Sequence, residues 1–183
     1  MTRGILGIGV CTLDVLTRVS SFPETESVEE AESSQLMGGG PVPTALAAAS
    51  KLGAPVAMMD ILGDDWRSKT IIDELNRLGI DCDRIIIEPG SKASLASVLI
   101  RQSDGARAIR FVKSTSNPIS KDLITKELIS GYQIIHCNGR HLDACLEAGS
   151  LCQLLGSETL FSFDGGAGRF RPELLPLLKK VDI

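Results

Sequence analysis

The sequence predicts an α/β fold, in which a mainly parallel β-sheet carries helices on both faces and a small β element is attached to it. Short apolar runs typical of buried strands alternate along the chain with segments of helical periodicity. This alternation favours parallel strands joined by helices. The middle of the chain interrupts the alternation with three successive strand-like runs, 82–87, 94–101 and 106–111, which indicate a separate β element.

The first half of the chain contains four strand-like segments and two helical ones. Strands are predicted at 4–10, 15–19, 26–36 and 55–63, and helices at 44–52 and 64–79. "GILGIGV" is a short apolar run bounded by turn residues, which is typical of a buried strand. The segment 26–36 is polar with scattered apolar residues and is predicted to be an exposed strand. Gly53 and Gly79 follow the two helical patterns and end them.

The second half continues with a hairpin and then returns to the alternation. "QSDGA" joins the runs 94–101 and 106–111, and its Asp104-Gly105 pair is a strong hairpin signal. Further strands are predicted at 132–139 and 159–166, and helices at 120–130, 141–155 and 172–180. The final "VDI" begins another apolar run, so we expect the C-terminal part of the fold to be missing. The alternative is a compact domain whose last strand is short.

Composition and charge narrow the class of protein. The chain has 183 residues, of which 43% are hydrophobic and 23% charged, so it can build a globular core in one domain. Its net charge of −4 and the absence of a basic run argue against a nucleic-acid partner. No apolar run is long enough to span a bilayer, and the first residues are not typical of a signal peptide. Five cysteines without a regular spacing indicate reduced thiols, and we expect a cytoplasmic protein.

The first glycine cluster, "GILGIGVCTLD", does not match a nucleotide-binding motif. A dinucleotide fingerprint needs a third glycine at the start of a helix, whereas here Gly7 and Gly9 are followed by a strand pattern. The sequence also contains no P-loop motif. Asp14 follows the first strand, where open α/β sheets bind ligands, and its carboxylate can accept hydrogen bonds from hydroxyl groups. The alternative role for Asp14 is a turn or cap residue.

The second cluster, "GGGPVPT" (38–44), is the strongest local signal. Glycine has no Cβ, so a ligand can approach the backbone closely there. Proline is tolerated in the first helical turn because those N–H groups have no partner within the helix. The remaining N–H groups favour an oxygen-rich or anionic ligand, and Thr44 adds a hydroxyl. The alternative is a tight loop before a capped helix.

"HCNGRH" (136–141) resembles a metal-binding sequence only superficially. His136 and Cys137 are adjacent near a strand end, so their side chains point to opposite faces. No second pair with ligand spacing exists, which argues against a zinc site. The segments 138–140 and 164–171 follow successive strands and are predicted to be loops facing a cleft. A Ser-His-Asp triad lacks a nucleophile elbow to support it.

Taken in order, these segments resemble the N-terminal portion of a ribokinase-like (PfkB-family) carbohydrate kinase. "GIGVCTLDVLTRVSSFPE" is similar to the family's opening strand with its Asp, and "GGGPVPTALAAASKLGAPVAMMDILGDD" to its first signature. "SLASVLIRQSDGARAIRF" resembles the strands of the β-sheet lid, and the two later strand-helix units match as well. The resemblance implies a Rossmann-type sandwich with a lid, spanning 1–183, whose lid strands come from about 12–36 and 82–113.

The resemblance also implies a function and a set of site residues. Members transfer the γ-phosphoryl group of ATP, with Mg²⁺, to a hydroxyl group of a sugar. By position, Asp14 would bind sugar hydroxyls, and Gly39 and Gly40 would present backbone N–H groups to the sugar. Thr44 stands where many members have a sugar-binding Asn, so the sugar is left open. Arg107, with Lys113, would meet an anionic substrate group, and their alternative role is as solvated edge-strand charges. A homodimer through the lid strands is a further expectation.

Part of the family pattern is absent from the sequence. No D-T-x-G-A-G-D-like stretch occurs, so the catalytic Asp, the glycine-rich anion hole and most ATP contacts are expected outside this chain. The chain is therefore predicted to carry the sugar-binding half of a kinase and to be inactive by itself. The alternative function is a non-catalytic sugar-binding or regulatory module that pairs with another subunit.

Overall fold

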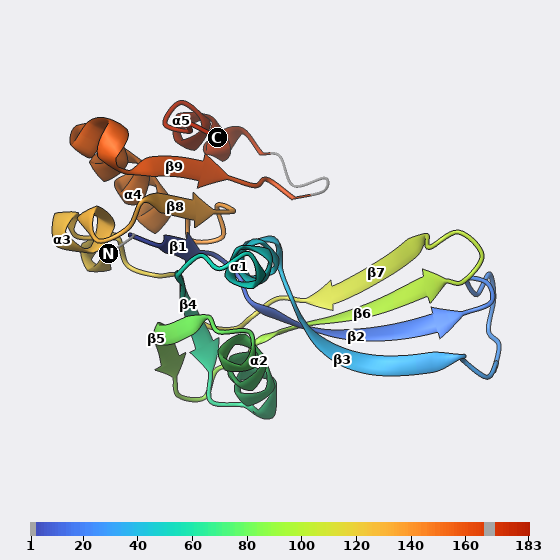
Figure 1. The fold of residues 1–183 in the computed structure, drawn as a ribbon. Helices are drawn as coiled ribbons and strands as arrows, with labels where there is room; N and C mark the ends of the chain where they lie inside the picture. Colours follow the sequence, from blue (N-terminus) through green and yellow to red (C-terminus); the bar gives the residue numbers. More distant parts are fainter. Residues whose placement is uncertain (1–2, 167–170) are drawn as a thin grey trace.

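Two β-sheets organise the chain, and the larger one is entirely parallel. The computed structural model describes residues 3–166 and 171–183. The strands of the larger sheet lie in the order β5-β4-β1-β8-β9, and each neighbouring pair is parallel. Their bounds are β1 (Ile5–Ile8), β4 (Val56–Gly63), β5 (Asp81–Glu88), β8 (Ile134–Cys137) and β9 (Leu160–Phe163). The mainly parallel α/β sheet predicted from the alternation is confirmed (Figure 1).

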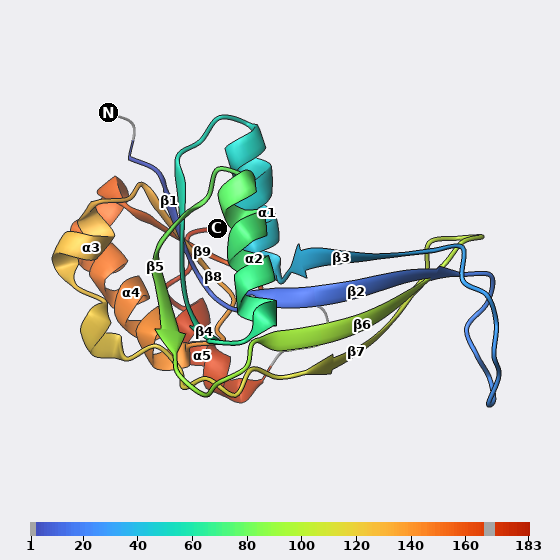
Figure 2. The ribbon, with the colours of Figure 1, turned by 90° about the horizontal axis from the view of Figure 1, so that it is seen from below.

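Helices cover both faces of the five-stranded sheet (Figures 1 and 2). The helices are α1 (Pro41–Lys51), α2 (Trp66–Arg77), α3 (Lys126–Ser130), α4 (Leu142–Leu155) and α5 (Leu175–Leu178). Alternation along the strands divides the core: Leu6 and Ile8 of β1 pack in a cluster with α4 and α5, whereas Met58 of β4 packs in a second cluster with α1 and α2. Each sheet face thus has its own apolar core.

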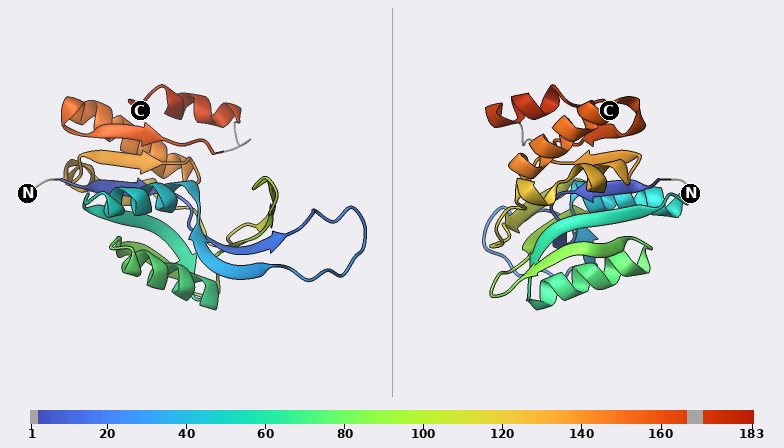
Figure 3. Two further views of the ribbon diagram at one scale, coloured as in Figure 1. Left: turned by 45° about the vertical axis from the view of Figure 1, so that its right-hand side comes forward. Right: turned by 90° about the vertical axis from the view of Figure 1, so that its left-hand side faces the viewer.

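The smaller sheet has four strands and projects from one end of the larger one (Figures 2 and 3). Its order is β3-β2-β6-β7, with bounds β2 (Thr12–Val19), β3 (Ser33–Gly39), β6 (Ser94–Arg101) and β7 (Arg107–Val112). β6 and β7 form the predicted hairpin, in which Gly105 takes a positive φ of 71°. The separate β element predicted from the middle of the chain is confirmed for the runs 94–101 and 106–111, and β2 and β3 complete it.

The chain passes between the two sheets at four places, which we call the crossings. They are residues 9–11 between β1 and β2, Gly40 between β3 and α1, residues 89–93 between β5 and β6, and residues 113–120 after β7. Hydrogen bonds at these segments position the four-stranded sheet on the α/β body, together with the packing of Leu13 of β2 in the cluster that includes α1 and α2.

Two boundaries of the predicted β element differ from the structure. The range 82–113 begins too early, because β5 pairs in parallel with β4 in the larger sheet. β5 follows α2 in a β-α-β unit, and such a connection returns the chain to the same sheet. The predicted strand at 26–36 lies later, at Ser33–Gly39, and therefore includes two of the three glycines.

The shorter helices also differ from the prediction. The helix expected at 120–130 is divided, because Ser120 caps a 3₁₀ turn at Lys121–Leu123 and Thr125 caps α3 separately. The helix expected at 172–180 is a 3₁₀ turn, Pro172–Leu174, followed by α5. The last residues lie along β9, where the Asp182 N–H donates to the Phe161 carbonyl over 2.8 Å. Among the described residues, no helix has the length and apolarity that a membrane span requires.

Candidate functional site

The glycine run forms the junction between β3 and α1. Gly38 and Gly39 end the strand, and Gly40 precedes the helix with a φ of 104°. A Cβ on Gly40 would lie 2.2 Å from the Val10 carbonyl oxygen, so both its conformation and its surroundings require glycine. Pro41 begins α1, as the prediction of proline in the first turn requires. The run therefore brings β3 against the crossing that leads into β2.

Asp14 lies directly against this run. A Cβ on Gly39 would be 2.2 Å from Asp14 Oδ2, so only glycine leaves room for the carboxylate. The Thr12 hydroxyl donates to Asp14 Oδ1 over 2.7 Å and fixes the orientation of the carboxylate. The N–H of Gly38 donates to a carboxylate oxygen of Glu74 on α2. The structure thus brings Asp14, Gly39 and Gly40 together.

The Asp14 carboxyl is half-buried, and its surroundings change its acidity. Burial raises the pKa of Asp14 above its ordinary value, the bond from Thr12 partly offsets this, and the negative charge of Glu74 raises it further. A carboxylate that burial disfavours in this way gains from hydroxyl groups brought by a ligand. Within the part of the chain that the structure describes, Asp14 has one hydrogen bond from a side chain, and it retains acceptor capacity for such hydroxyls.

Strand register separates Arg107 from Asp14. Asp14 pairs with Ala96 on β6, which pairs with Phe111 on β7, so Phe111 shares the row of Asp14. Arg107 pairs with Ile100, which lies four residues further along β6. Four residues of strand span roughly 13 Å, so Arg107 lies toward the far end of the four-stranded sheet. Its contact with an anionic substrate group stays a prediction, as does that of the exposed Lys113.

Thr44 lies in the first turn of α1, where its N–H donates to the Gly40 carbonyl over 3.1 Å. Its side chain is exposed, whereas the neighbouring Val42 and Leu46 are buried against the sheet. Thr44 is therefore free to meet a ligand at the start of the helix, and its role in choosing the sugar stays a prediction.

Side chains of the segment from His136 to His141 make contacts within the fold. His136 Nδ1 lies 3.0 Å from Ser162 Oγ, whereas Cys137 is buried in the core beside Cys145 of α4, so the adjacent pair points to opposite faces as predicted. Burial lowers the pKa of His136. Within the ranges that the structure describes, no cluster of three metal-binding side chains is found. Residues 167–170 of the loop predicted at 164–171 lie outside the described residues.

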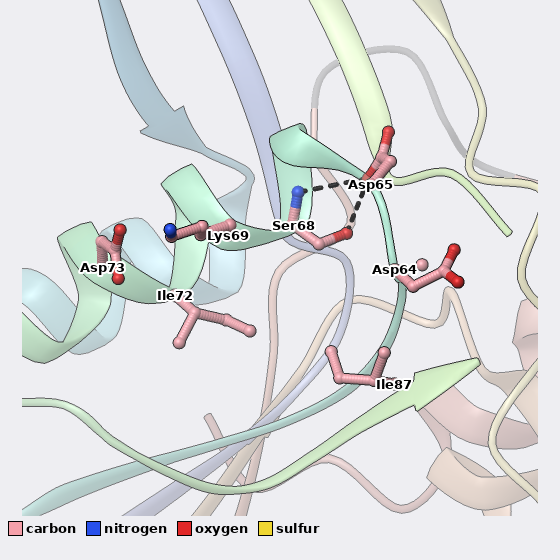
Figure 4. A pocket seen from close by; sticks show the side chains of 8 residues that line it. Asp64, Asp65, Ser68, Lys69, Ile72, Asp73 and Ile87 are labelled. Carbon is pink, nitrogen blue, oxygen red and sulfur yellow. Dashed lines mark hydrogen bonds between the residues drawn. The ribbon is translucent and has the colours of Figure 1, made fainter. Parts of the chain in front are cut away.

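A surface pocket beside the start of α2 holds several polar groups (Figure 4). It is lined by Gly63, Asp64, Asp65, Ser68, Lys69, Ile72, Asp73 and Ile87. Asp65 caps α2 by accepting from Ser68 Oγ over 2.8 Å, and Asp64 accepts from the N–H of Gly90 over 3.0 Å. These two carboxylates therefore stabilise the helix start and a crossing, and the pocket does not include the group around Asp14.

Sequence reasoning missed a buried pair beside the site, Asp60 and His141, whose Oδ1 and Nε2 atoms lie 2.8 Å apart. A signal for it was available: Asp60 is a charged residue inside the otherwise apolar strand "VAMMDILG". A carboxylate in a buried strand needs hydrogen-bonding partners, so it indicates a second polar group in the core. The position of His141 as that partner depends on the tertiary structure.

Fold and site together define a class of protein: an α/β domain with a projecting four-stranded sheet that begins beside a carboxylate and a glycine run. The chain belongs to the pfkB family of carbohydrate kinases, whose family model matches residues 3–179. The family resemblance drawn from the sequence is thereby confirmed.

Curated relatives are sugar kinases. The chain is 22% identical over 139 residues to ketohexokinase from Mus musculus, covering 76% of this chain and 47% of the relative. It is 29% identical over 162 residues to a probable fructokinase-3 from Arabidopsis thaliana, covering 80% of this chain and 46% of the relative. The chain thus spans about half the length of the curated relatives it matches.

Solved structures share the fold. A ribokinase from Giardia lamblia superposes with a TM-score of 0.82 at 19% identity, covering 99% of this chain and 57% of that one. An Arabidopsis thaliana ribokinase, solved with ribose and ATP, superposes with a TM-score of 0.78 at 20% identity. The match covers 100% of this chain and 59% of the ribokinase chain. These similarities confirm the ribokinase-like fold class.

Proposed function

We propose that this chain provides the sugar-binding part of a carbohydrate kinase and that the whole enzyme transfers the γ-phosphoryl group of ATP to a sugar hydroxyl. The observation that carries the proposal is the contact between Asp14 and Gly39. It places a carboxylate with spare acceptor capacity directly against glycine backbone, beside the base of the four-stranded sheet. Carboxylates and backbone N–H groups together recognise the hydroxyl groups of sugars.

Asp14 would accept hydrogen bonds from two or more sugar hydroxyls, and Gly39 and Gly40 would admit the sugar to the backbone. The four-stranded sheet would act as a lid, because Asp14 is part of β2 and the site lies where that sheet begins. Thr44 would face the variable part of the substrate. Family membership and the names of the relatives support a sugar or sugar derivative as the ligand.

ATP and Mg²⁺ follow from the family and are assigned no residues in this chain. The described residues bring together no group of three or more metal-ligating side chains, and the sequence contains no second glycine-rich signature with an Asp. Phosphoryl transfer depends on a base and on groups that stabilise negative charge. We infer that these groups are supplied outside this chain.

The test is ligand binding by the purified chain. A thermal-shift screen with sugars should reveal a ligand that raises the melting temperature, because binding to the folded state alone stabilises it. Asp14→Asn should abolish that shift, whereas Asp104→Asn, at an exposed carboxylate paired with Arg101, should retain it. If this chain alone formed a sugar phosphate from ATP, the proposal that it lacks the catalytic groups would be overturned. If no sugar in the panel bound, the proposal that it recognises a sugar would be overturned.

The same screen distinguishes the alternative, a non-catalytic sugar-binding module. A kinase half should gain ATP-dependent turnover when a C-terminal half of a related kinase is supplied, because the missing base is then present. A binding module should bind the sugar and stay inactive under the same conditions.

A further inference from the structure

A buried chain of hydrogen bonds connects the α/β body to two of the crossings. Its centre is the pair Asp60 on β4 and His141 at the start of α4, which are both 2% exposed. His141 Nε2 lies 2.8 Å from Asp60 Oδ1. Polar groups buried to this degree are retained in a core only when their hydrogen bonds are satisfied.

The hydrogen-bond partners of His141 show which of its ring nitrogens carries the proton. The N–H of Ile119 donates to His141 Nδ1 over 3.0 Å, so Nδ1 is an acceptor and carries no proton. The ring is therefore the neutral Nε2–H tautomer and donates to Asp60. The N–H of Cys11 donates to Asp60 Oδ2 over 2.6 Å, so the carboxylate accepts from both sides.

The two backbone donors belong to the segments that enter and leave the four-stranded sheet. Cys11 lies between β1 and β2, and Ile119 lies in the segment that follows β7. They are far apart in sequence, yet both end on one side-chain pair. The pair thus fixes the entry and the exit of the sheet to the same point of the body.

The Val10–Cys11 peptide group connects this pair to the glycine run. Its N–H donates to Asp60, while its carbonyl oxygen lies against Gly40, where a Cβ would be only 2.2 Å away. The next residue, Thr12, pairs with Gly39 and orients Asp14. Rotation of this single peptide group would therefore displace the glycine run and the carboxylate together.

We propose that Asp60 and His141 are a positioning pair for the sugar site: they hold the Val10–Cys11 peptide in the orientation that sets Asp14 against Gly39 and Gly40. Neither residue reaches the ligand. The inference rests on the proposed function only for its sugar-binding readout, because the orientation of the peptide can be measured without a ligand.

Asp60→Asn is the central variant. An amide offers one oxygen, so in either orientation it leaves the Cys11 N–H or the His141 Nε2–H facing an NH₂ group. Loss of one hydrogen bond to a charged group corresponds to roughly 10- to 100-fold in an equilibrium constant. We expect the sugar affinity of Asp60→Asn to fall by about that factor. His141→Gln should restore most of the affinity lost in His141→Leu, since Gln carries both an acceptor and a donor.

Ile135→Val is the matched control. Ile135 is fully buried on β8 in the same body, and its truncation lowers stability without touching the pair. The control should keep the sugar affinity of the wild type. Long-range ¹H–¹⁵N spectra should show the Nε2–H tautomer of His141 in the wild type.

If no sugar binds, that result counts against the proposed function and not against the positioning role. Amide hydrogen exchange then tests the positioning role without a ligand. The amides of residues 12–14 and 39–40 should then exchange at least about 10-fold faster in Asp60→Asn than in Ile135→Val. Equal exchange at these amides in both variants would overturn the positioning role. Where a sugar does bind, equal affinity in Asp60→Asn and the wild type would overturn it as well.

Discussion

Substituting Gly39 by Ala tests the contact on which the site depends. The new Cβ would lie 2.2 Å from Asp14 Oδ2, whereas ordinary contacts begin at 3.4 Å, so the carboxylate must move by about 1 Å. That movement breaks the 2.7 Å hydrogen bond from the Thr12 hydroxyl. The Asp side chain is short, so it has few other conformations in which it could avoid the new Cβ. Overpacking of this kind costs about 1–3 kcal/mol in the free energy of unfolding.

A double-mutant cycle isolates that contact. Asp14→Ala removes the carboxylate, so Gly39→Ala in that background should cost less than about 0.5 kcal/mol and leave a coupling free energy of about 1–3 kcal/mol. Urea denaturation of the four proteins measures each free energy. Gly38→Ala is the control, because the atoms nearest to its Cβ would belong to the flexible Glu74 side chain, the first of them at 3.2 Å. An equal cost of Gly39→Ala in both backgrounds would refute the reasoning.

Three further predictions concern protonation and assembly. Because the pKa of Asp14 is raised in the folded state, its ionisation destabilises the free chain as pH rises through that pKa. The affinity for the sugar should increase over the same pH interval, because the ionised carboxylate accepts the sugar hydroxyls. Calorimetry should measure this increase in the wild type and find none in Asp14→Asn. Hydrogen bonds from Ser91 and Asn117 lower the pKa of Glu88, so its stabilisation is present above the ordinary Glu value and is lost as pH falls through the folded pKa. The urea midpoints of the wild type and Glu88→Gln should therefore converge in acid. Leu36 is 53% exposed on the edge strand β3, so we expect a homodimer through the four-stranded sheet that Leu36→Glu converts to a monomer in light scattering.

The sequence alone was sufficient for those parts of the site that depend on local backbone chemistry. Three consecutive glycines before a proline-started helix indicate a close approach of the backbone, and Gly40 shows it in its positive φ. The Asp104-Gly105 pair specifies the hairpin because its turn type requires a positive φ. Asp14 was identified by its place after a strand, but the sequence could not show that Gly39 lies against it.

The parts that could not be predicted depend on contacts between distant segments. Asp60 and His141 are 81 positions apart and meet only after β4 and β8 have joined the same sheet. The strand pattern of β5 is equally suited to either sheet, and only its β-α-β connection with β4 determines which one it joins. Arg107 has a composition suited to an anionic ligand, yet strand register places it four residues beyond the row of Asp14.

The junction between the two sheets is held by carboxylates. Asp60 accepts from the N–H of Cys11, Asp64 from Gly90, Asp65 from Ala93, Glu74 from Gly38 and Glu88 from Asn117. Each donor is a backbone group at or beside a crossing, where neither sheet supplies a ladder partner. A hydrogen bond fixes direction as well as distance, whereas apolar packing fixes neither strictly. Such bonds give the sheet a defined angle to the body, in addition to the apolar packing of Leu13 and Leu95 against α1 and α2. Since Asp14 belongs to that sheet and Gly40 to its junction with the body, we expect the geometry of the proposed sugar site to depend on these carboxylates as much as on its own residues.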